Sequence, residues 1–264
     1  MGDWLLDLPV LPMAAVILGL TYLITALIYW VVTRLAQNER TRAAFKAISP
    51  GMLPPLSVVF ALLVGFLAAQ VWSEGERANT AVNREASALR DAILVSSALP
   101  PELDTRFRQL IRTYIQNTVT REWPAMARGD VTLSLAPPRL TEALQLALSL
   151  PASTPGQQAA QRALATSLQA VFDLRRERII LSRSSVNWVK WVVLLGQAAI
   201  MLVAIAMVHC DNRLANKIIL GIFATSVAVA LVLVASHSRP FTGQISVRPT
   251  YLLQVMPETG MARR

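Results

Sequence analysis

The stretch that decides the fold is MLPPLSVVFALLVGFLAAQVWS, residues 52–73. It holds no Asp, Glu, Lys or Arg, and its length reaches the roughly 20 apolar residues that a helix needs to cross a hydrocarbon core. Because a segment in lipid must satisfy its own backbone hydrogen bonds, the stretch is predicted to be a transmembrane helix. Three further stretches share this length and lack of charge: 8–33, 191–210 and 218–238.

The composition also indicates a membrane protein. Hydrophobic residues make up 54% of the 264 residues and charged residues 16%, against about 25% charged residues in soluble domains. The net charge of +9 suits a nucleic acid or an anionic membrane surface. The apolar stretches favour the membrane, so the lipid bilayer is the expected partner and no nucleic acid is expected.

The charged residues gather between the second and third spans, where residues 74–190 hold 26 of the 41 charges. Apolar positions in this insert recur every three to four residues, beginning with Ala78, Val82 and Ala86, which predicts helices. The expected fold class is therefore all-α integral membrane, with four transmembrane helices in two pairs flanking a helical extramembrane domain. The expected divisions are 1–73 for the first pair, 74–190 for the domain, 191–238 for the second pair and 239–264 for a short tail.

Proline residues predict several helix boundaries. One helix is expected to run from near Pro55 to Leu99 and to end at Pro100-Pro101, because proline cannot continue a helix. A second helix is expected to end at Pro124. Thr154-Pro155-Gly156-Gln157 has the residues of a capped helix start, and this helix is expected to continue without a break into the third span. A short helix over Leu140–Leu150 and a strand near Gln244–Val247 are also expected.

Residues for catalysis or metal binding are scarce. The only cluster with metal-ligand residue types is His209-Cys210-Asp211, and three adjacent helical residues point about 100° apart. An interfacial cap on the third span is the favoured interpretation, and no metal and no cofactor are expected. Glu85 and Glu122 are the carboxylates considered for acid–base chemistry, but nearby arginines favour ion pairing, so the protein is not expected to be an enzyme.

The second span has two distinct faces. Ala61, Gly65 and Ala69 repeat every four residues, and such a small-residue stripe lets another helix approach closely. The opposite face carries four large side chains, which are interpreted either as lipid-facing or as candidate pore lining with a hydrophobic constriction. These are Leu56, Phe60, Leu63 and Leu67.

Three arginines precede the third span: Arg175, Arg176 and Arg178. They are interpreted as a helix face near anionic lipid headgroups, with an anion-attracting role as the alternative. The spans hold no Asp, Glu, Lys or Arg, which argues against a proton-driven pump.

Four groups of residues carry a resemblance to a known family. They are Leu63–Phe66 with Trp72, Arg84–Leu89 and Leu99-Pro100; Tyr114 with Glu122–Met126 and Gly129; Leu174–Arg178 with Trp188; and Pro240–Gly243 with Val247 and Pro249. In this order they resemble the bestrophin-like family of bacterial multi-pass membrane proteins, formerly a domain of unknown function. The motif residues are Glu85, Glu122, Trp123, Pro124, Pro240, Phe241 and Gly243. One departure is Ser238-Arg239, where the family often has an acidic residue.

The resemblance implies a multi-pass protein of the bacterial inner membrane. Because bestrophins are pentameric anion channels with a hydrophobic neck on the second span, it also implies a homo-oligomer that conducts anions. In that case Phe60→Ala is expected to raise the conductance. The alternative is a non-conducting membrane scaffold or sensor whose helical domain binds a partner or a lipid.

The side of the membrane on which the large domain lies is predicted differently by two criteria. The loop 34–51 holds four basic residues and one acidic residue, and positive short loops stay in the cytoplasm, which places the domain outside. The resemblance implies a cytoplasmic domain.

Overall fold

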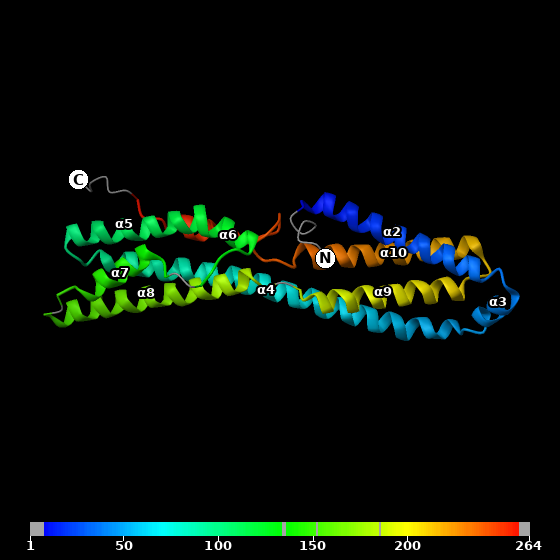
Figure 1. The fold of residues 1–264 in the computed structure, drawn as a ribbon. Helices are drawn as coiled ribbons and strands as arrows, with labels where there is room; N and C mark the ends of the chain where they lie inside the picture. Colours follow the sequence, from blue (N-terminus) through cyan, green and yellow to red (C-terminus); the bar gives the residue numbers. More distant parts are fainter. Residues whose placement is uncertain (1–7, 134–135, 152, 185, 259–264) are drawn as a thin grey trace. The chain divides into compact units, whose positions relative to one another are not determined.

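The computed structural model describes residues 8–133, 136–151, 153–184 and 186–258, which are helical throughout apart from connections. No strand occurs in these ranges, so the all-α prediction is confirmed. The helices are α2 (Val10–Leu35), α3 (Glu39–Lys46), α4 (Leu53–Ser96), α5 (Pro101–Asn117), α6 (Trp123–Arg128), α7 (Pro138–Leu148), α8 (Pro155–Ser182), α9 (Trp188–Val208), α10 (Arg213–Ser236) and α11 (Thr250–Gln254). Figure 1 labels α2 to α10.

Four helical segments are long and apolar enough to cross a membrane. They are α2, the segment Pro50–Ser96 that contains α4, α9 and α10. This confirms the four predicted spans. The second of them also continues well beyond its apolar part as one helix, as expected, and it ends at Ser96 shortly before Pro100-Pro101.

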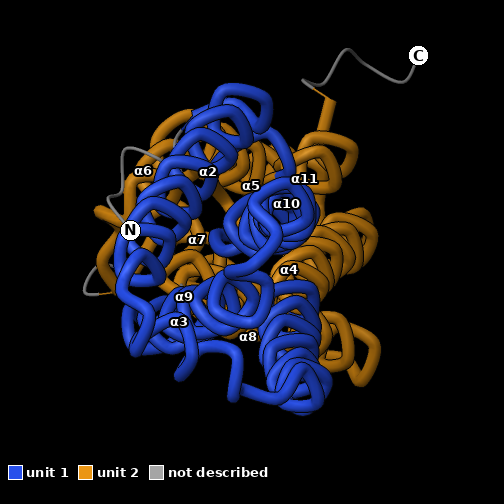
Figure 2. Tube along the Cα trace, turned by 90° about the vertical axis from the view of Figure 1, so that its right-hand side faces the viewer, with its two compact units in different colours: residues 1–73, 185–239, 243–245 blue, residues 74–184, 240–242, 246–264 orange. Residues whose placement is uncertain are grey.

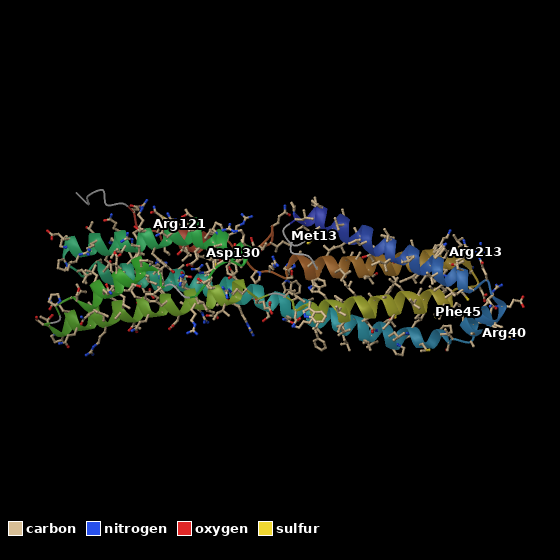
Figure 3. All side chains as sticks on the ribbon, viewed as in Figure 1. Met13, Arg40, Phe45, Arg121, Asp130 and Arg213 are labelled. Atoms are coloured by element: carbon tan, nitrogen blue, oxygen red, sulfur yellow. The ribbon has the colours of Figure 1, made fainter. Side chains whose placement is uncertain are left out.

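The chain divides into two compact units, coloured separately in Figure 2. Unit 1 comprises residues 1–73, 185–239 and 243–245, and unit 2 comprises residues 74–184, 240–242 and 246–264. Helix α4 contributes its first part to unit 1 and its second part to unit 2. Figure 3 shows mostly carbon side chains along the long helices of unit 1, and many nitrogen and oxygen tips on α5 and α8 of unit 2.

In unit 1, α10 packs along α2 and α9. Its core is built from apolar side chains such as Met13, Leu194 and Val227. One buried polar contact joins the spans: the amide of Asn216 donates to the carbonyl of Ala206 at 3.1 Å. The short helix α3 buries Phe45 in a hydrophobic cluster, and its Arg42 and Lys46 both pair with Asp211.

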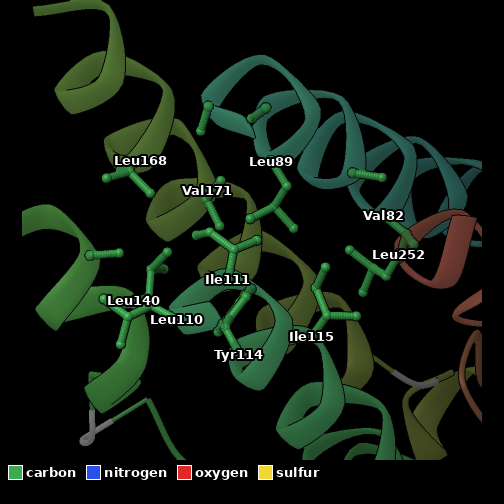
Figure 4. Packing of buried hydrophobic residues seen from close by; sticks show 14 of the residues in the cluster. Val82, Leu89, Leu110, Ile111, Tyr114, Ile115, Leu140, Leu168, Val171 and Leu252 are labelled. Atoms are coloured by element: carbon green, nitrogen blue, oxygen red, sulfur yellow. The ribbon is translucent and has the colours of Figure 1, made fainter. Parts of the chain in front are cut away.

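Unit 2 has its own hydrophobic core, shown in Figure 4. Val82 and Leu89 of α4 meet Ile111 and Ile115 of α5 there, together with side chains from α7, α8 and α11. At the start of α8, Thr154 and Gln157 form the reciprocal capping box that the sequence predicted. The box satisfies backbone N–H groups that a helix start otherwise leaves unpaired.

Pro124 does not end the helix that precedes it. The π-helical turn η2 (Thr118–Glu122) follows α5 directly, and α6 begins at Trp123. In a regular helix the ring of Pro124 would clash with the carbonyl of Thr120. Because proline has no N–H, that carbonyl would also lack its hydrogen-bond donor. The wider turn avoids this, with the Trp123 N–H bonded to the Thr118 carbonyl.

Two other predictions are corrected. Helix α8 does not run into the third span: it ends at Ser182, and the Asn187 side chain accepts the Val189 N–H to cap a new helix, α9. The expected strand at Gln244–Val247 is a turn instead, in which the Val247 N–H donates to the Pro240 carbonyl at 2.8 Å. Gly243 lies there at φ +85°, a backbone conformation that side chains other than glycine rarely adopt.

Candidate functional site

A buried charge network lies in the core of unit 2, with Arg178 at its centre. The buried positions of α8 include Leu164, Leu168, Val171, Arg175 and Arg178, with alternating spacings of four and three residues. This is the period of one helix face. The sequence therefore places two arginines on the face of α8 that packs into the core, and a buried charge must be paired there.

Two glutamates from different elements pair with Arg178. Its Nε donates to Glu85 Oε2 at 2.7 Å, and its Nη2 donates to Glu122 Oε1 at 2.7 Å. Glu85 comes from α4 and Glu122 from η2. The side chains of Arg178 and Glu85 are both fully buried. Arg175 binds the other oxygen of Glu122, with Nη2 at 2.6 Å.

Three more side chains complete the network. The Tyr114 hydroxyl of α5 donates to Glu85 Oε1 at 2.6 Å. The Arg178 guanidinium lies 5.2 Å from the ring centroid of Trp123, within the range of a cation–π interaction. The guanidinium also contacts the Met126 sulfur at 3.2 Å. The network therefore joins α4, α5, η2, α6 and α8.

The surroundings shift the pKa values of Tyr114 and Arg178. Burial, and next the charge of Glu85, raise the pKa of Tyr114 well above its usual 10.0. For Arg178, burial lowers the pKa, but the negative charge of Glu85 and Glu122 outweighs burial, so the pKa lies above its ordinary value. Both groups therefore keep their protons at neutral pH, and both glutamates are occupied by guanidinium groups. The arrangement ties helices together and presents no free acid or base.

The motif residues of the tail meet Trp123. The rings of Trp123 and Phe241 pack edge to face, with centroids 5.5 Å apart. The indole N–H of Trp123 donates to the Val247 carbonyl at 3.3 Å. Pro240 belongs to this turn and Pro124 lies in the first turn of α6. The structure thus brings Glu85, Glu122 and Trp123 to Arg178. It also brings Phe241 to Trp123, although these two residues are far apart in the sequence.

The three arginines that were candidates for attracting anions have different environments. Arg175 and Arg178 are buried and paired with glutamates, whereas Arg176 is exposed. The reason is the helix period: residues 175 and 178 share the core face of α8, and residue 176 points about 100° away from residue 175. Of the three, only Arg176 has an exposed guanidinium, and the other two are paired with glutamates.

The side chains predicted as candidate pore lining do not form the outer face of α4. Phe60 and Leu67 are each 8% exposed, and Phe60 packs on Phe223 of α10 with ring centroids 5.8 Å apart. Leu56 and Leu63 are partly buried. A pore between copies is lined by side chains that the single chain leaves exposed, so Phe60 and Leu67 do not fit that role here.

The outer face of α4 carries a different set of large side chains. Val58, Leu62 and Phe66 are 58%, 54% and 72% exposed, at a spacing of four residues. The small-residue stripe Ala61, Gly65 and Ala69 is also exposed. A Cβ added at Gly65 would meet nothing within 4 Å, so no helix among the described residues packs closely on the stripe at this position.

Metal-ligating groups do not cluster in the part of the chain that the structure describes: no three His, Cys, Asp or Glu residues could hold an ion there. His209 follows the end of α9 and its ring lies 3.0 Å from the Ile205 carbonyl. Asp211 pairs with Arg42 and Lys46 of α3. His209 and Asp211 therefore have separate contacts.

Sequence reasoning did not find the connection between Glu85 and Arg178, because 93 positions separate them. One signal was available. Glu85 falls between Val82 and Leu89 on the apolar face of its helix, and an acidic residue on a core face requires a buried cation. The sequence could not show which arginine supplies it.

Comparison with known proteins gives a family and a fold. A family model described as the bestrophin-like domain matches residues 19–252. Among curated proteins, none matches this chain.

Several solved structures are similar to this chain. A single-substitution variant of a bacterial bestrophin homologue from Klebsiella pneumoniae has a TM-score of 0.69 at 12% identity, covering 92% of this chain and 97% of that one. A second variant has a TM-score of 0.69 at 14% identity, covering 97% and 96%. A structure of the homologue phased with zinc has a TM-score of 0.69 at 12% identity, covering 92% and 95%. At these identities the likeness establishes the fold.

Proposed function

The chain belongs to the bestrophin-like family, and on that premise we propose that several copies assemble in the cell inner membrane into a channel for anions. The copies would surround a common axis, and the unit 1 part of α4 from each copy would line the passage. The helical unit 2 would stand outside the bilayer.

The observation that carries this proposal is the outer face of α4. Only 11% of the most apolar window of this span is buried inside the chain, against 39% for α9 and for α10. Val58, Leu62 and Phe66 form a ridge on this face. A ring of such ridges around an axis is a hydrophobic constriction, which gates by wetting and drying and needs no charge in the lipid region.

The small-residue stripe supports assembly at the same helix. Gly65 and Phe66 are adjacent, so their directions differ by about 100° around the helix. A neighbouring copy can therefore pack closely on Ala61, Gly65 and Ala69 while Phe66 points toward the axis. Lipid contact alone does not require small residues at a four-residue spacing.

The charge of the protein supports anions as the conducted species. The formal net charge is +9, and a field of this sign raises the local concentration of anions. Arg176 contributes an exposed guanidinium on α8.

The test is the mass of the detergent-purified protein by native mass spectrometry, followed by chloride flux into liposomes. We expect an oligomer and a flux that rises in Phe66→Ala, because trimming the ridge widens the constriction. The matched control is Phe60→Ala on the inner face, which is expected to lower thermal stability without raising the flux per complex.

A monomer by mass, or equal flux in Phe66→Ala and the unchanged protein, would refute the assignment of the constriction. A monomer would favour the scaffold or sensor hypothesis instead. If the chloride flux rose only in Phe60→Ala, the constriction would lie on the face of Leu56, Phe60, Leu63 and Leu67, as the sequence predicted.

A further inference from the structure

Unit 2 contains a cavity of about 400 Å³ beside the charge network, within the range of about 300–1,000 Å³ that small-molecule sites occupy. One wall comes from the end of α5 and from η2, including Asn117, Thr118 and Arg121. The start of α7 also lines the cavity, with Pro137 and Pro138.

The charges on the cavity wall are unequal. Three arginines and one glutamate line it: Arg121, Arg139, Arg175 and Glu122. Arg175 binds Glu122, and Arg139 is paired with Glu142 outside the wall. Within the described ranges no ion pair forms at Arg121, which is exposed and labelled in Figure 3. Of the three arginines that line the wall, Arg121 is therefore the one that forms no ion pair with a carboxylate of the described residues.

The backbone at this wall is also unusual. Arg121 and Glu122 belong to the π-helical turn, a rare conformation that occurs frequently at functional sites. The turn allows Glu122 to reach Arg175 and Arg178. Arg121, its neighbour on the same turn, remains available to the cavity.

We propose that this cavity binds a small organic anion, with its phosphate or carboxylate group on Arg121 and its apolar body against Pro137 and Pro138. A guanidinium recognises both groups through paired hydrogen bonds. Asn117 and Thr118 supply further hydrogen-bonding groups on the same wall. The proposal does not depend on whether the chain conducts ions.

Three probes separate the parts of the proposed ligand: phenyl phosphate, inorganic phosphate and phenol. Each is titrated calorimetrically into the purified full chain in detergent, in a dilute buffer that contains no phosphate or carboxylate and little chloride. We expect phenyl phosphate to bind most tightly, inorganic phosphate more weakly, and phenol not measurably. Because Arg121→Gln removes the charge-assisted hydrogen bonds to the phosphate, it should weaken the binding of phenyl phosphate about tenfold or more.

The matched control is Arg106→Gln, because Arg106 is an exposed arginine of α5 that does not line the cavity. Its affinity for phenyl phosphate should stay unchanged. Equal affinity losses in the two variants, or no saturable binding of phenyl phosphate, would overturn the proposal. The same titration in nanodiscs identifies the source of the natural anion. If phosphatidylglycerol competes with phenyl phosphate and phosphatidylcholine does not, the site is supported and its occupant is a lipid headgroup.

Discussion

Replacing Arg178 by methionine tests whether the buried charge network stabilises unit 2. Methionine has a similar length and suits the apolar surroundings beside Met126. The change removes both guanidinium contacts at 2.7 Å and leaves Glu85 fully buried, with only the Tyr114 hydroxyl as a partner. Glu122 still has Arg175. The main consequence is therefore one unpaired carboxylate in the core.

The expected magnitude follows from that carboxylate. Removing one partner of a buried ion pair typically costs about 3–5 kcal/mol. For a protein of this size about 1 kcal/mol shifts the melting temperature by about 2–4 °C, so the expected decrease is about 6–20 °C. The control is Arg176→Met, an exposed neighbour on the same helix, which should change stability by less than about 0.5 kcal/mol.

The assay is thermal unfolding of the full chain in detergent, for Arg178→Met, Glu85→Leu and the double variant. Because the double variant no longer buries an unpaired charge at this position, we expect it to be more stable than the sum of the two single changes predicts, by about 0.5–3 kcal/mol. Additive effects, or a loss in Arg178→Met no larger than in Arg176→Met, would refute the reasoning.

Two further predictions concern Tyr114 and Gly65. The folded protein keeps the Tyr114 proton at pH values where the unfolded chain loses it, since burial and then Glu85 raise its pKa. The stability that this provides is present below about pH 10 and declines as the pH rises further, so Tyr114→Phe should flatten that alkaline decline by up to about 1.4 kcal/mol per pH unit. Identical alkaline melting curves for the two proteins would contradict this. Gly65→Leu should lower the oligomer mass without unfolding the chain, because Gly65 is exposed and a Cβ added there meets nothing within 4 Å. The control is Gly196→Leu, where an added Cβ also meets nothing within 4 Å. An equal oligomer mass in the two variants would contradict assembly through the stripe.

Much of the fold could be predicted because local rules decide it. Apolar length alone identified the four spans, and the absence of a helix breaker after residue 55 predicted the long helix α4. Thr154 and Gln157 predicted the start of α8 because capping depends on residues three positions apart. Pro124 misled the prediction, since a π-helical turn can accommodate a proline that a regular helix cannot.

The candidate site was less accessible to sequence reasoning. The period of α4 predicted two faces, but it could not tell which side chains pack on α10 inside the chain. Phe60 and Phe66 have the same chemistry, yet Phe60 is buried in the core of unit 1, where it packs on Phe223, and Phe66 is exposed. Burial is a property of the neighbouring helices, which the sequence of one helix does not contain.

The sequence by itself determined that this protein is a helical membrane protein with a large charged insert, because the cost of placing charge and unpaired backbone groups in lipid is a local property of each segment. It also determined which residues share a helix face. Only the tertiary structure decided that Arg178 pairs with Glu85 and Glu122, and that Arg121 remains beside an open cavity. Such pairings join residues that lie far apart in the chain, and they form only where the packing of whole helices brings their charges together.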